Sequence, residues 1–321
     1  MSMQRKEPKY QIIDGVPRCV WIDPDILREN LKFKGKSGDV FVSTFPKSGT
    51  HWVQFIIQLI LKKGEPVTTH KEFTDNMRLF EYSKCQEWAS PLPLRAFLTH
   101  LPLSRCSMAE EAKYVYVARN PWDVCVSFFH MATNVSAYEF YDGTFQEFVE
   151  VFIGGNFGYG DYFEHVASGY ALRNEPNVLF LTYEELKNLT GNAVLKLAHF
   201  LGEEYGKTLK DNDELLKQLL QRSTAESMRS VLVLDTQESL SKDWEEVLAR
   251  KNHKCKNGFE GDENKYAFVR AAKVGGWREH FTPELLRRME CRIQECEKKS
   301  SVMELWKDIR AEAIEASKSS Q

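Results

Sequence analysis

The sequence lacks the features that mark several large classes of protein. Its seven cysteines are odd in number and form no C-x-x-C pair, which excludes a disulfide miniprotein and indicates free thiols in a reducing compartment. It has no H-E-x-x-H motif and no Cys/His cluster, so no metal site is expected. The first ten residues show no secretory signal, and the longest apolar run, around 53–61, falls short of the ~20 residues that span a bilayer. We therefore expect a cytoplasmic protein with no membrane partner.

An excess of charge of one sign is also missing. The 321 residues contain 43 Lys+Arg against 46 Asp+Glu, and the formal net charge is −3. General nucleic-acid binders usually carry a basic excess, so no nucleic-acid partner is expected. Hydrophobic residues make up 42% and charged residues 28%, as in ordinary globular chains, which excludes a disordered or collagen-like protein.

Short apolar runs alternate with helical patterns along the chain. Strands are predicted at 40–44, 96–99, 114–118 and 178–182, and helices at 52–61, 192–201, 213–221, 283–298 and 303–316. Residues 242–264 are predicted to form a long loop. This alternation predicts an α/β fold, with one three-layer domain over residues 1–321 and a central, mostly parallel sheet. About ten residues at the N-terminus and about five at the C-terminus are expected to be flexible.

A possible anion site follows the first predicted strand. Residues 45–50, F-P-K-S-G-T, pass directly into a helix, so free backbone N–H groups, the charge of Lys47 and two hydroxyls meet at one turn. An ordinary strand-to-helix turn is the simpler alternative. An NTP-dependent small-molecule kinase would use such a loop, but G-x-x-x-x-G-K-[ST] is not met and no carboxylate for magnesium follows a strand. Persistence of turnover in EDTA would exclude that kinase.

Five segments then resemble, in the same order, those of one known family. They are T-F-P-K-S-G-T-H-W at 44–52, L-T-H-L-P at 98–102, Y-V-A-R-N-P-W-D-V-C-V-S at 116–127, Y-E-E-L-K at 183–187, and R-A-A-K-V-G-G-W at 270–277. The chain resembles the cytosolic sulfotransferases over most of its length. The resemblance implies a P-loop-like phosphosulfate loop at 45–50.

The resemblance also implies a reaction and its residues. A sulfuryl group would move from 3′-phosphoadenosine 5′-phosphosulfate (PAPS) to the hydroxyl or amine of a small acceptor, without a metal. His100 would be the base, and Lys47 would neutralise charge on the leaving oxygen. The implied PAPS-binding residues are Lys47, Ser48, Gly49, Thr50 and His51 at the phosphosulfate, Trp52, Tyr183, Ser223, Thr224 and Met228 along the nucleotide, and Arg119, Ser127, Val269, Arg270, Ala271 and Ala272 at the 3′-phosphate. By residue type alone, Trp52 is typical of a helix core face and Arg119 of a salt bridge.

Several positions depart from the family pattern. Leu98 replaces the usual Lys or Arg, Ala225 an aromatic residue, and Ala271-Ala272 the usual Lys-Gly. The change at Leu98 predicts slower turnover, and those at Ala225 and 271–272 predict weaker PAPS affinity. Together they leave a non-catalytic PAPS-binding protein as an alternative. In the family's dimer motif, Pro283 replaces valine and Arg287 replaces the acid, so a monomer or a non-standard dimer is expected.

The acceptor is expected to be a phenol, biogenic amine or alcohol in an aromatic and apolar pocket. Candidate lining residues, each of which could also be core, are Phe80, Trp88, Phe97, Phe128, Phe129 and the stretch 138–141. Asp142 or Glu139 could pair with an amine.

Overall fold

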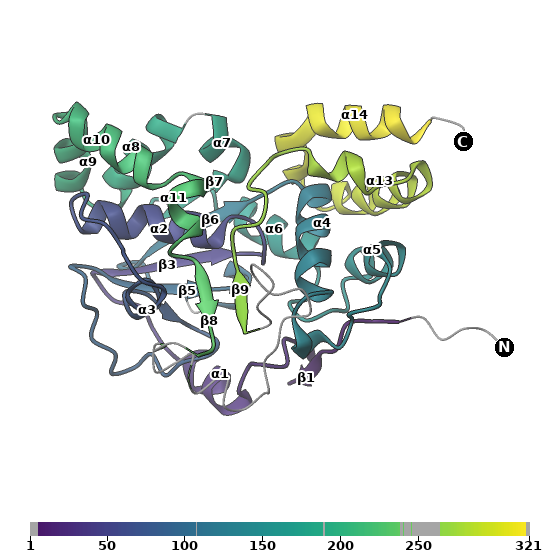
Figure 1. The fold of residues 1–321 in the computed structure, drawn as a ribbon, viewed down its shortest axis with the longest axis horizontal. Coiled ribbons are helices and arrows are strands. Elements are labelled where there is room, and N and C mark those ends of the chain that lie inside the picture. Colours follow the sequence, from purple (N-terminus) through teal and green to yellow (C-terminus); the bar gives the residue numbers. More distant parts are fainter. Residues whose placement is uncertain are drawn as a thin grey trace.

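A parallel five-stranded sheet lies at the centre of the molecule (Figure 1). The computed structural model describes residues 6–318 except 107, 189, 238–239, 241–244 and 246–263. The strand order is β4 (Arg78–Leu79), β5 (Arg95–Thr99), β3 (Asp39–Thr44), β6 (Lys113–Ala118) and β7 (Val178–Thr182), and every pairing is parallel. Two short antiparallel pairs flank it, β1 (Gln11–Ile13) with β2 (Val16–Arg18) and β8 (Val233–Asp235) with β9 (Lys265–Ala267).

Both faces of the sheet are buried, and alternate residues of each strand separate two cores. Phe41 of β3 points into an aromatic core, where its ring stacks on Phe97 at 5.0 Å and on Tyr114 at 5.2 Å. Its neighbours Val40 and Val42 belong to an aliphatic core on the opposite face. This period of two explains why the strands are near-continuous hydrophobic runs, as expected of a parallel sheet covered on both sides.

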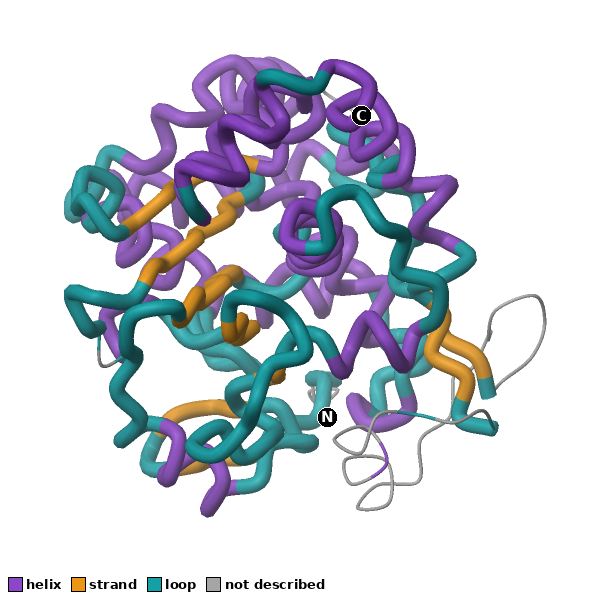
Figure 2. The backbone as a smooth tube through the Cα atoms, turned by 90° about the vertical axis from the view of Figure 1, so that its left-hand side faces the viewer, coloured by secondary structure: helices purple, strands orange, loops and turns teal. Residues whose placement is uncertain are grey.

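Helices form the outer layers, with strands between them in Figure 2. The helices are α1 (Pro24–Asn30), α2 (Thr50–Leu61), α3 (His70–Asp75), α4 (Pro121–Ala132), α5 (Phe145–Gly154), α6 (Tyr162–Ala171), α7 (Tyr183–Asn188), α8 (Thr190–Leu201), α9 (Glu203–Lys210), α10 (Asp213–Arg222), α11 (Ala225–Arg229), α13 (Pro283–Glu297) and α14 (Lys307–Ser317), with 3-10 turns η1 (Leu103–Arg105), η2 (Ser136–Tyr138), η3 (Gly276–Glu279) and η4 (Val302–Trp306). Residues of α2 and α8 build the aliphatic core, and residues of α4, α6 and α13 the aromatic one.

The predicted strands are confirmed as β3, β5, β6 and β7. Four predicted helices correspond to α2, α8, α10 and α13, but the one at 303–316 begins as the 3-10 turn η4 and becomes α-helical at Lys307. At this junction the backbone of buried Trp306, with φ −123° and ψ 29°, departs from helical geometry, and its Nε1 donates to Glu184 at 2.9 Å. Of the predicted loop at 242–264, only residues 245 and 264 are described.

The sheet topology places the site. Strand β3 pairs with β5 on one side and with β6 on the other, so the chain turns in opposite directions from the centre of the sheet. In such sheets ligands bind beyond the carboxyl ends of the strands at this point. The loops that follow β3, β5 and β6 begin with Phe45, His100 and Arg119.

The segment before β1 packs against the rest of the chain. Lys6 pairs with Asp142, Lys9 pairs with Glu139, and the Lys9 N–H donates to the Tyr138 carbonyl at 2.7 Å. Residues 1–5 and 319–321 lie outside the described residues. None of the described helices is both long enough and apolar enough to cross a membrane.

Candidate active site

The phosphate loop, residues 45–49, joins β3 to α2 through two residues in the left-handed region. Lys47 has a φ of 71°, and Gly49, the N-cap of α2, has a φ of 100°. Glycine is required there because a Cβ would strain the backbone and lie 2.8 Å from the Tyr183 ring. Within the described part of the chain no side chain caps α2, and the buried Ser48 hydroxyl has no hydrogen-bond partner. Donors at this helix start are therefore available to an anion.

Three cations gather at this loop. Burial and the charges of Arg119 and Arg270 lower the pKa of Lys47 to about 8. Burial and the charge of Arg119 likewise lower the pKa of Arg270. Since these like charges repel one another, a polyanion bound among them would be strongly favoured.

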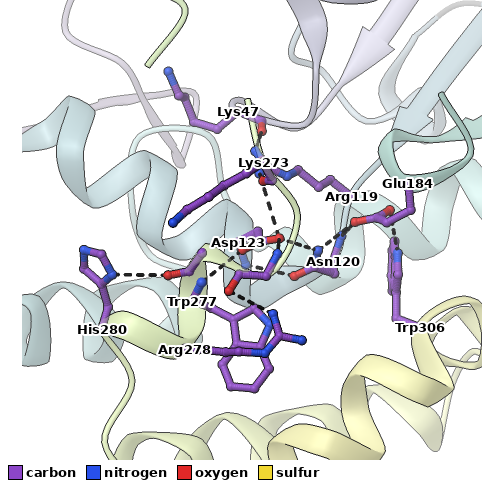
Figure 3. A network of polar contacts seen from close by, with 12 residues as sticks. Lys47, Arg119, Asn120, Asp123, Glu184, Lys273, Trp277, Arg278, His280 and Trp306 are labelled. Carbon is purple, nitrogen blue, oxygen red and sulfur yellow. Dashed lines mark hydrogen bonds and ion pairs between the residues drawn. The ribbon is translucent and has the colours of Figure 1, made fainter. Parts of the chain in front are cut away.

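Arg119 ties the phosphate loop to the segment at 270–273. Its Nη1 donates to the carbonyl of Lys47 at 3.0 Å and its Nη2 to the carbonyl of Lys273 at 2.9 Å (Figure 3). The guanidinium carbon lies 4.2 Å from the centre of the Tyr183 ring. The buried Nε has no partner among the described residues. Backbone and aromatic contacts, with an ion pair to Asp123 at 3.9 Å, thus fix Arg119 while its Nε remains to be satisfied.

Asp123, in the first turn of α4, holds the next part of the same segment. Its carboxylate accepts from the N–H groups of Gly275 at 2.8 Å and Trp277 at 3.1 Å (Figure 3). The Asn120 side chain donates to Asp123 at 2.9 Å and to Glu184 at 2.7 Å. The sequence alone did not predict that Asp123 would hold this segment. The available signal was its position three residues after Asn120, the N-cap of α4.

His100 lies directly after β5 and is held in one tautomer. Its Nδ1 lies 2.9 Å from the backbone oxygen of Thr44. A carbonyl can only accept, so Nδ1 carries the proton and Nε2 keeps its lone pair. Burial lowers the pKa of His100 to about 4, the bond to Thr44 acts against this, and the charge of Lys47 adds to it. The ring is therefore a neutral base at pH 7, beside the cation cluster in the same cavity.

Aromatic rings line the part of the cavity beside the cations. Trp52 meets Tyr183 edge to face at 5.3 Å, and its Nε1 donates to the Ser223 carbonyl at 2.9 Å. The Lys187 ammonium lies 5.5 Å from the Trp52 ring centre, and Met228 lines the cavity nearby. These contacts fix a flat, partly apolar surface of the kind that stacks on a base.

Two predicted nucleotide-binding residues use their hydroxyl groups elsewhere. Ser223 ends α10 and donates to the Leu220 carbonyl at 3.0 Å, and Thr224 caps α11 by accepting from the Ser227 N–H at 3.2 Å. Neither side chain is among the cavity-lining residues. The Ser223 carbonyl instead accepts from Trp52, and Thr224 caps the helix that carries Met228.

The other predicted residues line the cavity, apart from Ser48, which is buried beneath the loop. Thr50 and His51 come from the start of α2, Ser127 from α4, and residues 269–272 from the segment after β9. The His51 ring lies 4.4 Å from Phe268, and burial holds its pKa well below its ordinary value, so it is a neutral member of an aromatic cluster.

The Ala272 backbone adopts the left-handed conformation that the family's usual glycine adopts without strain. Its φ is 49°, where a Cβ crowds the backbone. Ala272→Gly should therefore stabilise the fold by on the order of 0.5 to 1 kcal/mol, as the relieved strain exceeds the added chain entropy. Chemical denaturation measures this. The matched control is Ala271→Gly, where φ is not positive and the change should destabilise; equal effects of the two changes would contradict the strain.

The end of the cavity beyond His100 is aromatic and aliphatic. It is lined by Trp21, Leu79, Tyr82, Leu98 and Tyr159. The Tyr159 ring lies 5.4 Å from the His100 ring, and its hydroxyl lies 3.0 Å from that of Tyr82. Sequence reasoning missed Trp21, Leu79, Tyr82 and Tyr159, since no motif contains them.

The aromatic residues predicted for this pocket occupy the core instead. None of the candidates Phe80, Trp88, Phe97, Phe128, Phe129 and 138–141 belongs to the described cavity lining. Phe80 and Phe97 face the packed side of the sheet, whereas Leu79 and Leu98 beside them reach the cavity. The sequence did not reveal which strand residues would border the cavity, because both faces of the sheet are apolar.

The acidic residues predicted to bind an amine are also placed elsewhere. Glu139 and Asp142 are exposed, pair with Lys9 and Lys6, and do not line the cavity. Within the described residues, no three His, Cys, Asp or Glu side chains form a group that could hold a metal ion.

Solved structures share this fold, and other known proteins are similar to this chain in sequence. A mouse sulfotransferase was solved in complex with PAP, 3′-phosphoadenosine 5′-phosphate. It superposes with a TM-score of 0.69 at 24% identity, covering 94% of this chain and 99% of its own. A rabbit (Oryctolagus cuniculus) amine sulfotransferase is 32% identical over 91% of this chain and 91% of its own length. A guinea-pig (Cavia porcellus) 3-beta-hydroxysteroid sulfotransferase is 31% identical over 82% of this chain and 85% of its own. The family model described as "Sulfotransferase domain" matches residues 37–302, and the chain therefore belongs to the sulfotransferase family.

Proposed function

We propose that this sulfotransferase transfers the sulfuryl group of PAPS to the hydroxyl group of a small, uncharged acceptor. One observation carries the proposal. The Nδ1 bond of His100 leaves Nε2 as the base, between a basic end of the cavity and an apolar end. A sulfated nucleotide matches the first end, and a small aromatic or alicyclic alcohol matches the second.

The residues at the basic end fit PAPS. The Arg119 Nε, unpartnered among the described residues, and the uncapped start of α2 provide donors that anionic oxygens satisfy. We assign the phosphosulfate to residues 47–51 and the 3′-phosphate to Arg119, Ser127 and residues 269–272. The adenine lies against the aromatic surface of Trp52 and Tyr183, with Met228 beside it.

Each group has one chemical task. PAPS supplies the sulfuryl group that the acceptor oxygen receives. His100 takes the acceptor's proton at Nε2 as that oxygen attacks, and Thr44 keeps the imidazole in the tautomer that allows this. Lys47 stabilises the negative charge that develops on the departing bridging oxygen. A nucleotide anion beside His100 opposes the Lys47 charge that lowers its pKa, which makes it a stronger base.

The charge of the lining residues supports an uncharged acceptor. Among the described lining residues the one carboxylate is Asp123, whose oxygens accept from backbone N–H groups of the nucleotide side. An ammonium at the end formed by Trp21, Tyr82 and Tyr159 would meet no carboxylate among the described lining residues, and burying it unpaired would cost several kcal/mol.

A matched pair of acceptors tests this assignment. With labelled PAPS, 4-ethylphenol should be sulfated with a kcat/KM at least about tenfold above that of tyramine, which differs by an ammonium group. The rabbit relative is named an amine sulfotransferase, so an amine is the competing acceptor. Equal or faster turnover of tyramine would show that the pocket accepts a cation and would refute the neutral acceptor.

The remaining assignments are narrower. We place the enzyme in the cytoplasm, supported by the free state of the six described cysteines. We treat residues 1–321 as one domain, because the family model spans 37–302 and both cores share one sheet. We expect a monomer or a non-standard dimer, because Arg278 pairs with Glu312 and Arg287 with Glu284 within the chain.

A further inference from the structure

The main chain of His100 is held from both sides by polar side chains. Its N–H donates to the Glu81 carboxylate, and its carbonyl lies 3.1 Å from the His165 Nε2. With the bond from Nδ1 to the Thr44 carbonyl, three separate contacts fix this residue. Neither Glu81 nor His165 lines the cavity. Both residues contact His100, which does line it, so an effect on the reaction can pass through His100.

Glu81 is a buried carboxyl group in the loop after the edge strand β4. The residue is 1% exposed. Burial raises its pKa to about 7, while hydrogen bonds from His100 and Thr99 and the charge of buried Arg18 act in the opposite direction. A carboxyl group is costly to remove from water, so its oxygens must be used. One of them accepts from the N–H of His100, the first residue after β5.

His165, on α6, fixes the opposite side in a single tautomer. The His100 carbonyl only accepts, so the His165 Nε2 carries the proton. Its Nδ1 then accepts from the Tyr116 hydroxyl at 2.6 Å. Burial lowers the pKa of His165 to about 3, so the ring stays neutral near pH 7. One neutral ring thus joins α6, β6 and His100.

We propose that Glu81 and His165 are positioning residues for sulfuryl transfer, which hold the main chain of His100 so that Nε2 meets the acceptor hydroxyl. The inference rests on the proposed function, because it takes His100 as the base. A displacement of about 1 Å at a reacting group can reduce a rate by about 10²-fold. A purely structural role would instead weaken folding and nucleotide binding together with turnover.

Two substitutions at Glu81 form a matched pair. Glu81→Gln keeps an acceptor oxygen for the His100 N–H, and Glu81→Leu fills the same space without one. Glu81→Leu should lower kcat about 10- to 100-fold with the Kd of PAP within about twofold of the wild type, and Glu81→Gln should retain most of kcat. Here PAP is 3′-phosphoadenosine 5′-phosphate, which is PAPS without its sulfuryl group. Calorimetry gives Kd, and circular dichroism checks folding. Wild-type kcat in folded Glu81→Leu, or an equal loss of PAP binding, overturns the proposal.

His165 provides a second measurement if Glu81→Leu does not fold. His165→Gln keeps an N–H donor for the His100 carbonyl, and His165→Leu does not. The leucine variant should lose about tenfold more kcat than the glutamine variant, with PAP binding equal in both. Equal kcat in the two variants contradicts the proposal.

His100→Ala separates this inference from the proposed function. Retained turnover in His100→Ala removes the base and the inference together. An inactive His100→Ala beside a fully active, folded Glu81→Leu removes only the inference.

Discussion

Replacing His100 with alanine is expected to lower kcat about 10²- to 10⁴-fold, the usual contribution of a general base. The imidazole is the group that holds a lone pair at the junction of the basic and apolar ends of the cavity. The nucleotide contacts assigned to Lys47 and Arg119 stay intact, so the Kd of PAP should change little. Turnover with labelled PAPS and calorimetry with PAP separate the two quantities.

His199→Ala is the control for this substitution. His199 pairs with Glu203 on the outer side of α8 and does not line the cavity, so its loss should leave kcat unchanged. Comparable turnover in His100→Ala and His199→Ala would exclude His100 as the base.

Lys47→Met should cost about 10²- to 10³-fold in kcat, because a charge that meets the leaving oxygen only as the bond breaks acts on the transition state. It should also weaken PAP binding, by a smaller factor, since Arg119 and Arg270 remain. Methionine preserves the length of the side chain, which limits the change to the ammonium group. Single-turnover rates at saturating PAPS isolate the chemical step from binding.

Lys196→Met removes the same charge from the exposed surface of α8 and serves as the matched control. It should leave both kcat and the Kd of PAP unchanged. If Lys47→Met raised only the KM for PAPS at wild-type kcat, Lys47 would be a binding residue alone.

Long, strongly patterned elements could be predicted from the sequence, and short ones could not. The β3 strand and the α2 helix have continuous or periodic apolar residues, and both were predicted. Strand β4 has two residues, which is too short for any periodicity, yet it forms the edge of the sheet next to Glu81. The 3-10 start of the C-terminal helix ends at Trp306, whose partner Glu184 lies 122 residues away in the sequence, beyond the reach of a local pattern.

The candidate site could also be predicted only in part from the sequence. Lys47, His100, Arg119 and Arg270 lie in recognisable segments, and the structure gathers them around one cavity. The apolar end depends on Trp21, Tyr82 and Tyr159, which come from three distant loops with no shared motif. Their meeting is a property of the topology, so a single sequence could not indicate it.

At Ala272 the left-handed backbone conformation occurs without the glycine that usually permits it. The family pattern places glycine here, yet the alanine retains a φ of 49° while Arg119 and Asp123 secure the residues on its C-terminal side. The surrounding hydrogen bonds thus hold a backbone conformation that glycine would adopt without steric strain. A pattern that requires the glycine would fail to recognise this cavity-lining segment. In distant relatives, the segment is therefore better recognised by the residues that hold it, here Arg119 and Asp123, than by its glycine.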